Sequence, residues 1–184
     1  GARVFQGGGN EILGNDLQEM VLEASGNALQ RLYPQFHTAD HVGWSKVYEK
    51  AQKGAPDALK AIGDEGEPAK NPVCKAILGF IAGGKKGADI RTQFESSPYG
   101  WSRDAVDGGL QVLLVAGLIS AQDERGQTLD PKELERKTIG KVMFKVESAT
   151  VTTAQRIQIR KLLQKVGLSA KQGEELAYIP QFLQ

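Results

Sequence analysis

Apolar positions recur in the first 70 residues at spacings of three and four, which is the pattern of amphipathic helices. The pattern predicts a long helix over residues 15 to 33, ended by Pro34, and shorter helices over residues 44 to 54 and 55 to 63. We expect two apolar stripes to be buried: Leu17, Met20, Val21, Ala24, Ala28 and Leu32 in the long helix, and Trp44, Val47, Tyr48 and Ala51 in the next.

Residues 63 to 72 (GDEGEPAKNP) have no apolar period and indicate a linker at a domain boundary. After it, Asn71 as N-cap and Pro72 at the first helical position open a helix that stops at two glycines. A short helix over residues 87 to 96 and a third helix that starts at Ser102 follow. The predicted core positions are Val73, Ile77, Leu78, Ile81, Ile90, Phe94, Ala105, Val106, Leu110, Leu113 and Leu114.

Two strands are predicted next, over residues 118 to 122 and 141 to 147. The second alternates Val142, Phe144 and Val146 with charged residues, which indicates a half-buried antiparallel strand. The connection between them contains turn formers, and DPKELERKT (130 to 138) allows a helical turn or two. Three helices followed by a strand hairpin are the order of a winged helix, in which the third helix reads DNA and the hairpin is the wing.

A last amphipathic helix is predicted over residues 152 to 167, with Ile157, Ile159, Leu162, Leu163 and Val166 as its apolar residues. The sequence therefore predicts a mainly α protein with a central winged-helix module. Its parts are an N-terminal helical segment (1–69), a winged-helix-like domain (70–148) and a C-terminal helical segment (149–184), which packs back on either of the others.

Composition narrows the possible functions. Twenty-three Lys and Arg against 22 Asp and Glu give a net charge of +1, so any nucleic-acid contact must come from a local patch. The single cysteine, Cys74, excludes an internal disulfide, lies among apolar neighbours and is expected in the core. Because the sequence also lacks a signal peptide pattern and a stretch of about 20 apolar residues, we expect a cytoplasmic protein with no membrane contact.

Two motifs resemble catalytic or binding sites. Residues 79 to 86 fit GxxxxGK, but a second lysine replaces the Ser or Thr that holds magnesium, and a helix precedes the motif where a phosphate loop needs a strand. His37, Asp40 and His41 have the spacing of metal ligands but lie in a loop with no clear third ligand. We therefore expect no catalytic group, no cofactor and no metal site.

Basic residues gather around the predicted winged helix and form its candidate nucleic-acid surface. Phosphate contacts need such side chains, and base reading needs polar side chains on the exposed face of the third helix. Acidic residues are interleaved, since residues 123 to 147 contain six of each sign. Double-stranded DNA and a protein partner therefore stay open as alternatives. The candidates for DNA contact are Lys85, Lys86, Arg91, Ser102, Arg103, Gln111, Arg125, Lys141 and Lys145.

Five blocks of the sequence resemble the C-terminal region of the large P-loop ATPases of BREX phage-resistance systems, the BrxC and PglY type. They are residues 31 to 44 (RLYPQFHTADHVGW), 53 to 63 (KGAPDALKAIG), 71 to 78 (NPVCKAIL), 98 to 114 (PYGWSRDAVDGGLQVLL) and 162 to 175 (LLQKVGLSAKQGEE). The resemblance implies a fragment of a larger ATPase that acts with other defence components against phage DNA. None of that family's nucleotide-binding motifs is present in the blocks.

Two hypotheses follow. In the first, the chain is a non-catalytic accessory region of a defence ATPase whose winged helix contacts DNA. In the second, it is a docking module for other defence subunits or for self-assembly. The two differ in salt dependence, because phosphate contacts weaken steeply with salt and apolar contacts do not.

Overall fold

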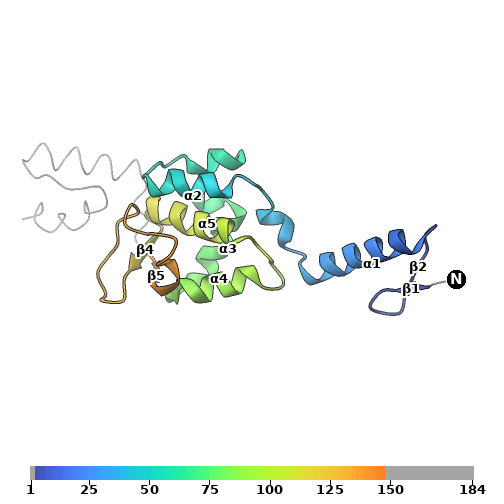
Figure 1. Ribbon diagram of the computed structural model, residues 1–184. Coiled ribbons are helices and arrows are strands. Elements are labelled where there is room, and N and C mark those ends of the chain that lie inside the picture. Colours follow the sequence, from blue (N-terminus) through green and yellow to red (C-terminus); the bar gives the residue numbers. More distant parts are fainter. Residues whose placement is uncertain (1–2, 148–184) are drawn as a thin grey trace, which may run out of the picture.

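A computed structural model describes residues 3–147. This part is mainly α-helical with two small antiparallel sheets, as the sequence predicts, and it consists of a body and a projecting arm (Figure 1). The body contains α2 (Trp44–Gln52), α3 (Pro72–Ile81), α4 (Gly87–Glu95) and α5 (Arg103–Val115), and the arm contains α1 (Leu17–Leu32). The helix predicted over residues 152 to 167 lies outside the described residues.

The predicted caps form. Asn71 accepts hydrogen bonds from the backbone N–H groups of Val73 and Cys74 at 3.0 and 3.1 Å, which starts α3. Ser102 accepts one from Ala105 at 3.2 Å, which starts α5. Each cap satisfies backbone donors that a helix N-terminus leaves without partners, so the sequence located both helix starts correctly.

The sheet of the body joins three strands in the order β3-β5-β4. β4 (Ile119–Gln122) and β5 (Met143–Val146) form the predicted hairpin, while β3 (Lys85–Lys86) was not predicted. β5 buries Phe144 as expected but leaves Val146 exposed. The turns expected in residues 130 to 138 form without joining into a helix: the Glu133 N–H donates to the Asp130 carbonyl and the Thr138 N–H to the Glu135 carbonyl, each at 2.9 Å. Asp130 caps a turn there, and a 3-10 turn follows at Ile139–Lys141.

One hydrophobic core runs through the whole body. It combines residues of α2 and of the 3-10 turn Ala58–Ile62 with residues of α3, α4, α5 and the sheet. The boundary expected at residue 69 therefore falls inside a single packed unit, and part of the expected linker forms a 3-10 turn, Pro68–Lys70, beside α3. Gly87 allows the start of α4 to approach the Ile139 carbonyl, where any Cβ would collide with it.

The arm stands apart from this core. α1 packs mainly on a small hairpin of β1 (Val4–Phe5) and β2 (Glu11–Ile12), and none of its residues is fully buried. Its C-terminal end meets the turn before α5: Tyr33 lies against Gly100, and the Gln35 carbonyl accepts a hydrogen bond from Trp101 Nε1 at 2.9 Å. The prediction that the stripe of α1 faces a core is thus wrong for the described residues, because α1 extends away from the body (Figure 1).

Cys74 lies in the core as predicted, and burial raises the pKa of its thiol to about 12. Because the thiolate is the reactive form, the native chain is expected to resist a maleimide at neutral pH and to react fully once unfolded in urea. Mass spectrometry of the two samples measures this. Rapid modification of the native chain would contradict the described core.

Candidate nucleic-acid interface

Helix α5, the predicted reader helix, is enclosed by the rest of the body. Every residue from 105 to 114 is buried. Trp44 of α2 packs against Gly108, where a Cβ would lie 3.1 Å from its ring. On another side, the side-chain amide of Gln111 donates a hydrogen bond to the Pro131 carbonyl. The prediction that Gln111 lies on an exposed, base-reading face is therefore wrong, because the connection between the strands covers it.

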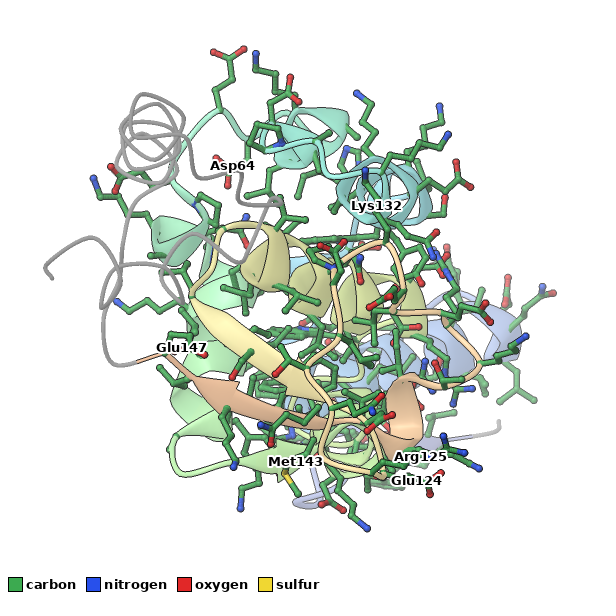
Figure 2. All side chains as sticks on the ribbon, turned by 90° about the vertical axis from the view of Figure 1, so that its left-hand side faces the viewer. Asp64, Glu124, Arg125, Lys132, Met143 and Glu147 are labelled. Atoms are coloured by element: carbon green, nitrogen blue, oxygen red, sulfur yellow. The ribbon has the colours of Figure 1, made fainter. Side chains whose placement is uncertain are left out.

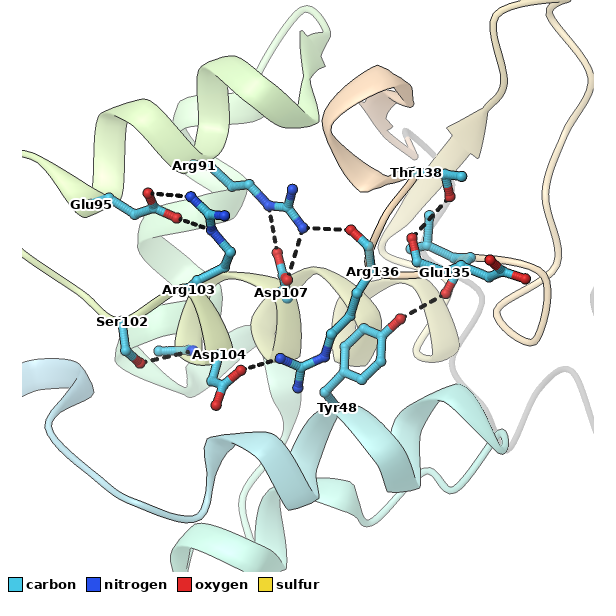
Figure 3. Close-up of polar contacts among 12 residues, drawn as sticks. Tyr48, Arg91, Glu95, Ser102, Arg103, Asp104, Asp107, Glu135, Arg136 and Thr138 are labelled. Carbon is cyan, nitrogen blue, oxygen red and sulfur yellow. Dashed lines mark hydrogen bonds and ion pairs between the residues drawn. The ribbon is translucent and has the colours of Figure 1, made fainter.

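The Arg91 side chain also lies largely inside the body. Its guanidinium forms two hydrogen bonds of 2.9 Å with the Asp107 carboxylate and a third, of 2.8 Å, with the Arg136 carbonyl (Figure 3). The Arg91 side chain is 15% exposed and that of Asp107 is 0% exposed. Burial raises the pKa of the Asp107 carboxyl, and the Arg91 hydrogen bonds offset part of this. The expectation that Arg91 is free for a phosphate fails, because its donors connect α4, α5 and the connection between the strands.

Arg103 and Arg136 form further pairs at the N-terminal end of α5. Arg103 binds the Glu95 carboxylate at 2.8 and 3.1 Å, which lowers the pKa of Glu95. Arg136 pairs with Asp104 and lies over the Tyr48 ring, 4.3 Å from its centroid (Figure 3). Ser102 is used as the cap of α5. The candidate residues here are brought together, but each already has a partner within the chain.

These side chains line an open cleft of about 370 Å³. Its cationic groups are balanced: three arginines have carboxylate partners, and Lys137 pairs with Glu135 at 2.8 Å. An anion would have to displace a carboxylate, which makes the cleft a poor phosphate site and a good structural clamp. The lining residues are Arg91, Arg103, Asp104, Asp107, Arg136 and Lys137.

The other candidates lie on the three-stranded sheet and its hairpin. Lys86 and Lys145 are exposed, whereas Lys85 is half-buried and lies over the Phe80 ring at 5.3 Å. Lys141 pairs with Glu124 at 3.6 Å, and Glu124 lies beside Arg125 at the hairpin turn (Figure 2). A second cleft, of about 350 Å³, opens beside this turn and is lined by Asp123, Glu124, Leu129, Glu133, Glu135, Thr138, Lys141 and Val142. The hairpin thus carries exposed lysines beside an acidic surface.

The two sequence motifs that resemble metal and phosphate sites, at residues 37 to 41 and 79 to 86, have structural roles in the fold. His41 Nδ1 accepts a hydrogen bond from the Gly43 N–H at 2.9 Å, next to the start of α2. Within residues 3–147, no group of three or more His, Cys, Asp or Glu residues is placed to hold a metal ion. The GxxxxGK segment begins inside α3, which contains Gly79, and ends in β3, so a helix stands where a phosphate loop needs a strand, as expected. Over the same residues, no helix is both long and apolar enough to cross a bilayer.

Helix α1 carries an exposed surface that was not predicted from the sequence. We call it the apolar face, and its residues Leu17, Val21, Leu22, Leu29 and Leu32 are each 50–64% exposed. The β1–β2 hairpin covers a different side of the helix: Asn27 donates a hydrogen bond to Gln6, and Arg31 donates one to the Gly7 carbonyl at 2.7 Å. The apolar stripe in the sequence indicated this surface, but a sequence pattern does not show which part of the fold, if any, covers it.

The chain was compared with protein-family models, curated proteins and solved structures, and none of them matched it.

The Arg91–Asp107 and Arg103–Glu95 ion pairs are expected to differ greatly in their contribution to the free energy of unfolding. Asp107→Ala is expected to lower the free energy of unfolding by about 3–5 kcal/mol, since it leaves a buried guanidinium without its partner. The control Glu95→Ala removes the partly buried partner of the exposed Arg103 and should cost less than about 1 kcal/mol. Urea denaturation followed by tryptophan fluorescence measures both, and equal losses would contradict the clamp.

Proposed function

We propose that the chain is a non-catalytic docking module of a phage-defence ATPase, through which copies of the parent protein associate. The observation that carries the proposal is the contrast between two helices. α5, which would have to enter a DNA groove, is buried from residue 105 to residue 114, whereas α1 extends from the body with an apolar face exposed. Exposed apolar patches of this kind mark protein contacts.

A winged helix is proposed as the framework of the body. Two features support it: the order helix, strand, helix, helix and hairpin over residues 72 to 146, and the strand order β3-β5-β4. Its third helix would then serve as the central scaffold, because α2 and the connection between the strands occupy the sides that a DNA-reading helix leaves free.

The parent ATPase is proposed from the resemblance to the BREX proteins. Two of the blocks that carry the resemblance form the joint between arm and body. Tyr33 and Gln35, from the first block, contact Gly100 and Trp101, from the PYGW block. A cis Ser97–Pro98 bond precedes this block, and the Pro98 carbonyl accepts a hydrogen bond from Gln35 at 3.1 Å. The joint would orient α1 for docking.

DNA contact by the hairpin is the second candidate function. It is favoured by Lys86 and Lys145, which are exposed on neighbouring strands. Contact limited to these lysines would be with phosphates and would carry no base recognition.

Fluorescence anisotropy of labelled duplex DNA across salt concentrations tests the choice. We expect only weak binding that falls with salt, is reduced by Lys86→Ala/Lys145→Ala and is unchanged by Arg103→Ala, which affects a residue already paired with Glu95. Sequence-selective binding that is lost in Arg103→Ala would contradict the docking proposal and favour DNA reading at the end of α5.

Docking predicts association of the intact chain in solution. Leu22→Glu/Leu29→Glu places two charges on the apolar face and is expected to make the chain monomeric in light scattering, with its circular dichroism unchanged. Val42→Glu is the matched control, since Val42 is an exposed apolar residue outside that face. If the double variant associates as strongly as the native chain, docking through α1 is wrong.

A further inference from the structure

The apolar face of α1 has an acidic border. Glu19 and Glu23 follow one another on successive turns, Glu19 lies one turn from Leu22, and Asp16 caps the helix. The basic residue of α1, Arg31, donates its hydrogen bonds to the Gly7 and Asn27 carbonyls. A segment that covers this face should therefore be apolar on one side and basic beside it.

Residues 152 to 167 of the chain have this character. Their sequence predicts an amphipathic helix with Ile159, Leu162, Leu163 and Val166 on one face. It contains four basic residues, Arg156, Arg160, Lys161 and Lys165, and no acidic residue. At 16 residues it equals α1 in length. Apolar pattern, charge and length thus all complement α1.

The geometry of the body determines whether residues 152 to 167 could reach α1 of the same chain or only α1 of a second copy. The arm meets the body beside Gly100, before the N-terminus of α5, whereas the Glu147 N–H donates to the Leu118 carbonyl, after its C-terminus. The 13 residues of α5 separate these points by about 20 Å. α1 then runs away from the body, on the side opposite the β4–β5 hairpin (Figure 1).

The connection within one chain is too short for this distance. The five residue steps from Glu147 to Thr152 span at most about 18 Å when fully extended. A helix that starts there cannot lie along an apolar face whose near end is about 20 Å away and whose far end is about 24 Å further. The C-terminal segment of a second copy has no such restriction.

We infer that residues 152 to 167 of a second copy cover the apolar face of α1. The inference rests on the proposed docking function and names its occupant. If each of two chains supplies its segment to the other, two identical contacts form and the assembly closes as a twofold dimer. The charged borders contribute attraction that salt screens, and the apolar faces contribute the rest.

The test uses light scattering of the full chain at several concentrations and two salt levels. Glu19→Lys/Glu23→Lys and Arg160→Glu/Lys161→Glu are each expected to raise the dimer dissociation constant about tenfold or more at low salt, since each places like charges together. The four changes combined in one chain should restore much of the affinity. Glu49→Lys/Glu65→Lys makes the same charge change on exposed residues of the body and should have no effect.

The other possible outcomes overturn the inference that residues 152 to 167 of a second copy cover the apolar face. A dimer weakened by the α1 changes but indifferent to Arg160→Glu/Lys161→Glu means that another surface, such as a second α1, covers the face, and the docking function survives. If Leu22→Glu/Leu29→Glu also has no effect, the docking function fails as well. A chain that is monomeric at all concentrations overturns self-assembly, and DNA binding then becomes the function to pursue.

Discussion

Helix α5 can lie at the centre of the body only if each of its sides finds a partner, and one of those sides bears a carboxylate. Asp107 is fully buried, and the bidentate contact from Arg91 is what makes its burial tolerable. The same guanidinium holds the Arg136 carbonyl and so fixes the connection between the strands over α5. α2 covers a further side, where Gly108 admits the Trp44 ring. The interaction that completes the core thereby also removes the surface that a DNA-reading helix would need.

Local signals made most of the elements predictable. Asn71, Pro72 and Ser102 stand at helix starts because their side chains or ring geometry suit those positions, whatever the rest of the fold does. The two-residue strand β3 was missed because it is too short to show an alternation, and it pairs with β5 from far along the chain. Residues 130 to 138 form separate turns rather than a continuous helix, and Gln111 and Tyr48 bind the carbonyls of Pro131 and Leu134 in this connection.

The candidate site was less predictable, because the charge of a residue does not show its partner. Arg91, Arg103 and Gln111 have the composition of a DNA-reading surface, yet their partners Asp107, Glu95 and Pro131 lie eight to twenty residues away in the sequence. Asp104 and Asp107 were a usable signal: two carboxylates one turn apart at the start of an otherwise apolar helix require cationic partners. Two of the misassigned residues, Arg91 and Gln111, instead bind carbonyls of the connection between the strands and hold it over α5.

Enclosure of α5 and exposure of α1 have a common consequence for function. The arginines of the cleft beside α5 are already paired with carboxylates, so a partner gains little by binding there, where each new contact would break an existing one. α1 offers the opposite case, because its leucines lose water without breaking any contact of the described chain. The proposed docking would therefore draw its binding free energy from the arm, and the joint at Gly100 and Trp101 determines the direction in which the apolar face points.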